Sequence, residues 1–146
     1  MKKVIFGIVA LALSALVVFT SLNTGENYAE AAGVIGPWVN AHLFFGRLNA
    51  EEVSNLTGFG SKLFGHFALF ALTGLFSSLF LSSLLKKRTA WVLYLCYGLI
   101  LASLGEVIQI FVAGRSPSVA DVAVNLAGYL LLPLIHRFYR RLNPPR

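Results

Sequence analysis

The chain has 146 residues, of which 57% are hydrophobic and 12% are charged, and its formal net charge is +6. A water-soluble domain of this length cannot bury so much apolar surface, so the composition excludes an ordinary soluble protein and indicates a membrane protein. Nucleic acid is not an expected partner, because no basic patch is interleaved with aromatic residues as such surfaces usually are.

Four apolar runs are long enough to cross a bilayer, which takes about 20 helical residues. They lie near residues 4–22, 64–85, 90–112 and 119–135. The predicted fold class is therefore all-α, a polytopic bundle of four transmembrane helices. The fourth run contains Pro133, which we place near the end of the span, where a lost backbone hydrogen bond matters least.

The first run has a second interpretation as a signal peptide. Lys2 and Lys3 precede it, and the small-residue stretch Ala29-Glu30-Ala31 follows it. We favour an uncleaved anchor, because the apolar run is long for a signal and the small residues lie about ten positions beyond its end.

Basic residues predict the orientation of the bundle. With four spans, the three basic groups that flank them share one side of the membrane, and the positive-inside bias makes that side the cytoplasm. Both termini are then inside (N-in/C-in). The three groups are Lys2 and Lys3; Lys86, Lys87 and Arg88; and Arg137, Arg140, Arg141 and Arg146.

The chain divides into four parts on this basis. Residues 1–22 form the anchor helix, and 23–61 form an extracytoplasmic loop. Residues 62–136 form a core of three transmembrane helices, and 137–146 form a basic cytoplasmic tail that continues as helix until Pro144. Within the loop, the aromatic stretch after Pro37 indicates a helix lying in the interface plane, or a loop packed over the helix ends.

Polar residues occur in pairs at one end of three predicted spans. Each pair is three or four residues apart, so its members share a helical face, and all three pairs lie at the predicted outer surface. The short connector AGRSPS adds Arg115 between the last two spans. The candidate ligand-binding residues are Lys62, His66, Glu106, Gln109, Arg115, Asp121 and Asn125.

Charges at this depth are expected to face the bundle interior or a wet cavity. Facing lipid would cost a few kcal/mol for each charged side chain. Arg115 or Lys62 can neutralise Glu106 or Asp121. The alternative is that these groups only join helices through hydrogen bonds, which fits Asn125 best.

These residues resemble the motifs of the VanZ-like family of small bacterial membrane proteins. The match covers about half of the chain, and it departs from the family pattern at Ser61, where a charge is often found, and at Phe70, where tyrosine is. One motif is K-x3-HF with a later glycine, at Lys62, His66, Phe67 and Gly74. The other is E-x2-Q, G-R and D-x3-N-x2-G, at Glu106, Gln109, Gly114, Arg115, Asp121, Asn125 and Gly128.

The resemblance implies a multi-pass protein of the bacterial cytoplasmic membrane and a role in the cell envelope. The founding member of the family is associated with low-level resistance to the glycopeptide teicoplanin. Our leading hypothesis is that the outward-facing polar residues bind or process a membrane lipid or a lipid-linked envelope precursor. The sequence leaves the oligomeric state open, a homo-oligomer included.

Two further functions compete with this hypothesis. His66 with Glu106 or Asp121 can act as a general acid and base pair in a membrane-embedded hydrolase or transferase. An oligomeric transporter could instead use Glu106 to carry a proton, although the inner halves of the spans contain no charge. We expect no cofactor and no metal, because one histidine with two carboxylates lacks a recognised metal-ligand spacing.

Overall fold

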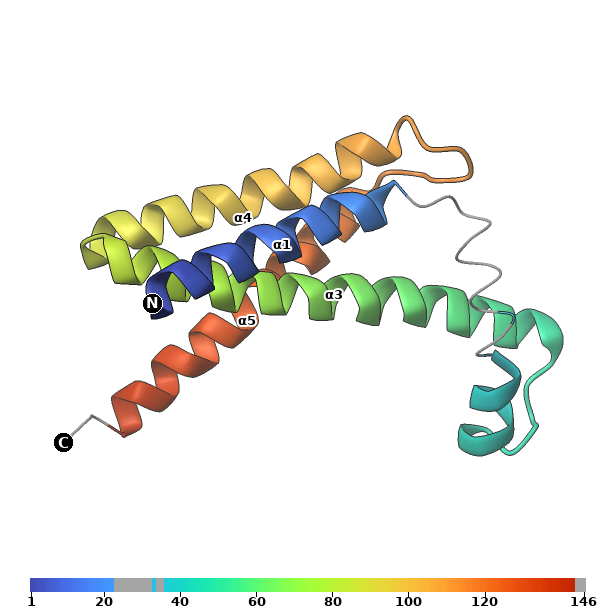
Figure 1. Cartoon of the computed structure of the whole chain (residues 1–146). Helices are drawn as coiled ribbons and strands as arrows, with labels where there is room; N and C mark the ends of the chain where they lie inside the picture. The colour runs from blue at the N-terminus through green and yellow to red at the C-terminus, as the bar shows by residue number, and fades with distance from the viewer. Residues whose placement is uncertain (23–32, 34–35, 144–146) are drawn as a thin grey trace.

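The computed structural model describes residues 1–22, 33 and 36–143, with side chains left out at 54–64. It is dominated by four long helices (Figure 1), each of which is apolar and long enough to cross a membrane. The prediction of an all-α bundle with four candidate transmembrane helices is confirmed. The helices are α1 (Lys2–Ser21), α3 (Ala50–Leu84), α4 (Lys87–Gln109) and α5 (Val119–Leu142).

The three basic groups that flank the spans lie at one end of the bundle. The N-terminus, the turn between α3 and α4 and the last turns of α5 all lie on the same side in Figure 1, as the sequence predicts. The turn between α4 and α5 lies at the opposite end. We call the first the basic end and the second the turn end.

Helix α3 begins much earlier than the sequence analysis placed it. We predicted a loop up to residue 61, but α3 starts at Ala50 behind a capping box. The Asn49 side chain accepts from the Glu52 backbone N–H at 2.9 Å, and the Glu52 carboxylate accepts from the Asn49 N–H at 2.9 Å. These two bonds satisfy donors that a helix start would otherwise leave open. Within the part of α3 whose side chains are described, Gly65–Leu84 is long and apolar enough to span the membrane.

A short helix over 36–43 precedes α3, which agrees with the helical form of the two predictions for this aromatic segment. The turn after it is held by Asn40, whose side chain exchanges two hydrogen bonds with the backbone of Leu48, at 2.9 and 3.2 Å. Trp38 is exposed and stacks on His42. Its position in the membrane interface stays a prediction.

The bundle interior holds polar side chains beside its apolar core, and many large apolar side chains lie outside. Ser14, Thr73, Gln109 and Asn125 are buried, whereas many leucines, isoleucines and phenylalanines are exposed. This arrangement suits lipid as the solvent, because a lipid-facing side chain gains nothing from burial and a buried polar group can bond across helices.

Two glycines allow α3 and α5 to approach at backbone distance. A Cβ atom on Gly74 would lie 1.9 Å from the carbonyl oxygen of Tyr129, and one on Gly128 would lie 2.7 Å from that of Phe67. Such contact through small residues is the usual way in which membrane helices pack closely. Gly74 and Gly128, both part of the motifs noted above, therefore serve helix packing.

Pro133 interrupts α5 in the interior of the helix. We placed it near the end of the span, but α5 continues to Leu142, and Pro133 is buried. Proline has no N–H, so the carbonyl four residues earlier, that of Tyr129, loses its helical partner. The Tyr94 hydroxyl on α4 donates to this oxygen at 2.5 Å, and the two tyrosine rings stack at 4.6 Å. The bond lost to proline is thus replaced by a bond between helices.

This replacement gives a first prediction. Tyr94→Phe should lower the free energy of unfolding by about 1–3 kcal/mol, because the buried Tyr129 carbonyl is left without a donor. Pro133→Ala restores the helical N–H, so Tyr94→Phe should cost less in that background. Thermal unfolding in detergent of the two single variants and the double variant measures the coupling. Equal costs in both backgrounds would contradict the assignment.

Candidate functional site

Glu106 is the most deeply buried carboxylate at the turn end. It lies one turn before the end of α4 with 6% of its surface exposed. Its Oε1 accepts from Gln109 Nε2 at 3.2 Å, and its Oε2 accepts from the backbone N–H of Ser118 at 3.0 Å. Ser118 is the N-cap of α5, where open N–H groups and the helix dipole favour negative charge. The start of α5 therefore stabilises the Glu106 carboxylate.

Gln109 joins this carboxylate to Arg115. Its side chain is 1% exposed and uses both ends of its amide: Nε2 donates to Glu106, and Oε1 accepts from Arg115 Nε at 3.2 Å. Arg115 lies in the turn between α4 and α5 and is half-buried. We call Glu106, Gln109 and Arg115 the polar triad.

The backbone of the turn allows Arg115 to fold back onto α4. Gly114 has a φ of +70°, which side-chain-bearing residues rarely adopt. The Arg115 N–H donates to the Val112 carbonyl at 3.3 Å. These features return the chain toward the end of α4, where Gln109 is placed to accept the bond from Arg115.

His66 and Asn125 lie at a similar depth on adjoining helices. Their exposed fractions are 7% and 3%. Helices α3 and α5 run in the same direction from the turn end (Figure 1), and Gly128 packs against Phe67. Asn125 is one turn before Gly128, and His66 is next to Phe67, so the two residues are within about one helical turn along the bundle axis.

Asp121 and Lys62 complete the set of predicted site residues. Asp121 is half-buried in the first turn of α5, where a carboxylate is favoured. Lys62 belongs to α3, but its side chain lies outside the described residues. The structure thus joins Glu106, Gln109 and Arg115 by hydrogen bonds. It places the other four residues on the neighbouring parts of α3 and α5.

Sequence reasoning missed two parts of this region. Ser118 is not among the predicted site residues, yet its backbone N–H donates to the Glu106 carboxylate. Its position before an apolar run with Asp121 in the first turn is a recognisable N-cap signal. Ser21, at the end of α1, packs against Gly105, where a Cβ would lie 3.1 Å from the serine oxygen. No sequence pattern predicts that contact.

The geometry of the triad suits positioning better than proton transfer. Both carboxylate oxygens of Glu106 already accept hydrogen bonds, and Gln109 orients the plane of the Arg115 guanidinium. Within the part of the chain that the structure describes, no three histidine, cysteine, aspartate or glutamate side chains are grouped to hold a metal. An oriented cation at the bundle surface is the main chemical feature of this end.

The fold and this region define a multi-pass α-helical membrane protein with a buried polar network at one end of the bundle. The chain belongs to the VanZ/LLP1 family, whose match covers residues 6–140. This range includes all four candidate transmembrane helices almost entirely. Comparisons with curated proteins and with solved structures found no match.

Proposed function

We infer that Arg115, oriented by the other two members of the polar triad, binds the anionic group of a membrane lipid or lipid-linked precursor in the bacterial cell envelope. The positive-inside bias puts the basic end in the cytoplasm. The turn end then lies at the outer surface of the cytoplasmic membrane. A half-buried Arg115 in this position is level with the headgroups of the outer leaflet.

The observation that carries the proposal is the hydrogen bond from Arg115 Nε to the buried Gln109. A free arginine side chain loses much rotamer entropy when it binds a ligand, and an oriented one loses less. A guanidinium also presents its N–H groups as a planar fork that matches phosphate or carboxylate. The triad therefore supports recognition of an anionic group by a preorganised cation.

The other site residues have supporting roles in this proposal. His66 and Asn125 supply polar groups from the neighbouring helices α3 and α5. Lys62 supplies a second cation, because its spacing of four residues from His66 puts both on one face of α3. Asp121 helps to orient the bound group. Binding an envelope lipid in this way would connect the protein to the glycopeptide resistance associated with the founding member of the family.

Site-specific photo-crosslinking tests the proposal. A diazirine amino acid replaces Ser116, which is exposed and adjacent to Arg115. The protein is placed in phosphatidylcholine vesicles that contain phosphatidylglycerol or a polyprenyl phosphate. We expect labelling by at least one anionic lipid, reduced about tenfold or more by Arg115→Gln, since a charge-assisted contact is worth about 1.5–3 kcal/mol.

The matched control is the same probe at Val107, which is exposed on α4 beside Glu106. Labelling from Val107 reports lipid that surrounds the bundle and should not respond to Arg115→Gln. Arg115→Lys should retain part of the labelling from Ser116, because the charge stays and the fork is lost. Equal labelling from both positions, unaffected by Arg115→Gln, would overturn the proposed function.

A further inference from the structure

A second polar region lies at the basic end, remote from the triad. Two adjoining pockets, of about 540 and 350 Å³, share Arg137 and Arg141 of α5. The larger is otherwise apolar, lined by Leu134, Ile135 and Phe138. The smaller pocket has a mixed polar and apolar lining and lies between α3, α4 and α5. Its lining includes Ser78, Ser82, Lys87, Trp91, His136 and Arg140.

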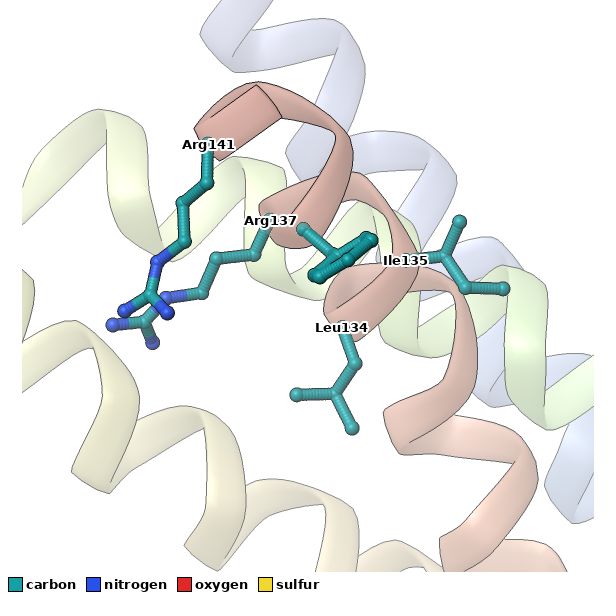
Figure 2. A pocket seen from close by; sticks show the side chains of 5 residues that line it. Leu134, Ile135, Arg137 and Arg141 are labelled. Atoms are coloured by element: carbon teal, nitrogen blue, oxygen red, sulfur yellow. The ribbon is translucent and has the colours of Figure 1, made fainter. Parts of the chain in front are cut away.

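The two shared arginines extend from one face of α5 in the same direction, as Figure 2 shows. They are four residues apart, and like charges at this spacing repel each other. Among the residues that the structure describes, no aspartate or glutamate lies at this end to offset them. Between Glu52 and Glu106, and after Asp121, the sequence contains no aspartate or glutamate.

Arg137 is fixed in place by aromatic packing. Its guanidinium carbon lies 4.9 Å from the centre of the Trp91 ring, a cation–π contact. Trp91 packs edge-on against Tyr94, with ring centres 5.3 Å apart. Tyr94 in turn holds the Tyr129 carbonyl that Pro133 leaves open. Pro133, the two aromatic rings and Arg137 therefore form one connected support.

We propose that these pockets bind one anionic phospholipid, with its phosphate between Arg137 and Arg141. The polar pocket receives the headgroup, where Lys87, Arg140 and the two serines offer donors. The apolar pocket receives the start of an acyl chain along Leu134 and Phe138. An amphipathic anion fits both pockets and relieves the repulsion between the arginines. Basic pockets between membrane helices commonly bind such headgroups.

The site is independent of the proposed function, because it lies at the opposite end of the bundle and shares no residue with the triad. A soluble phosphate would find the same arginines but would leave the apolar pocket unfilled. An acidic peptide has no hydrocarbon chain to fill the apolar pocket. The pairing of a basic and an apolar pocket is what favours a lipid.

The test is native mass spectrometry of the full chain released from nanodiscs that contain phosphatidylcholine and phosphatidylglycerol. We expect the wild-type protein to retain phosphatidylglycerol. The double variant Arg137→Gln plus Arg141→Gln should retain at least about tenfold less of it. The matched control is Lys86→Gln plus Arg88→Gln, which removes the same charge from exposed positions at the same end. The control should retain the lipid.

Several outcomes would overturn the proposal. Equal losses in the two double variants would indicate general surface charge, and no loss in either would exclude the site. Displacement of the lipid by the same concentration of inorganic phosphate would indicate a soluble ligand. If the arginine pair proves necessary for folding, Arg141→Gln alone preserves the contact between Arg137 and Trp91 and should still lower retention. Arg115→Gln should leave retention unchanged, which separates this result from the test of the triad.

Discussion

Gly74→Ala is expected to disrupt the bundle. The added Cβ would lie 1.9 Å from the Tyr129 carbonyl oxygen and 2.7 Å from its carbon, and both are backbone atoms that cannot rotate away. Helices α3 and α5 would have to separate, which also disturbs the bond from Tyr94 to Tyr129. Overpacked cores typically lose about 1–3 kcal/mol of stability. We expect the free energy of unfolding to fall by at least that much. Thermal unfolding in detergent measures it.

Gly65→Ala is the matched control on the same helix. Nothing lies within 4 Å of a Cβ at Gly65. Alanine there should be neutral or should stabilise the helix by up to about 1 kcal/mol, because glycine has poor helix propensity. If both variants unfold at the wild-type temperature, α3 and α5 are not packed through Gly74.

Glu106→Ala is expected to have the second large effect. It removes the acceptor for the Ser118 N–H and for Gln109 Nε2, both at the turn end of the bundle. Each buried donor left open costs about 1–3 kcal/mol. Loss of the carboxylate also removes the favourable charge at the start of α5.

Glu106→Gln separates the two contributions. It keeps one acceptor oxygen and nearly the same shape, so the stability of the fold should fall less than in Glu106→Ala. Thermal unfolding of the two variants, with Val107→Ala as a lipid-facing control on the same turn, gives the comparison. A Glu106→Ala protein as stable as the wild type would mean that the bonds to Ser118 and Gln109 contribute nothing to the fold.

The helices could be predicted from the sequence because lipid leaves few alternatives. An apolar run of the right length must form a helix to satisfy its backbone, so four runs predict four helices. The early start of α3 was missed because residues 50–64 are too polar to span a membrane. The pattern of Asn49 followed by Glu52 three positions later is a capping signal that could have found it.

The site could be predicted only in part. The spacing of Glu106 and Gln109 places them on one face of α4, and the hydrogen bond between them confirms that expectation. The fold-back of Arg115 depends on the conformation of Gly114, and the bond from Ser118 depends on how α5 meets α4. The partner of the Tyr129 carbonyl also belongs to another helix. Such contacts are set by tertiary packing, which local patterns do not encode.

We propose that a buried network positions Arg115 to bind an anionic lipid group. Labelling from the Ser116 probe in a Gln109→Ala protein tests it most directly, because this change leaves every charge in place. We predict that labelling by anionic lipid falls toward the level seen with Arg115→Gln, while labelling from Val107 is unchanged. Wild-type labelling in Gln109→Ala, together with a loss in Arg115→Gln, would contradict the claim, since Arg115 would then act without the network.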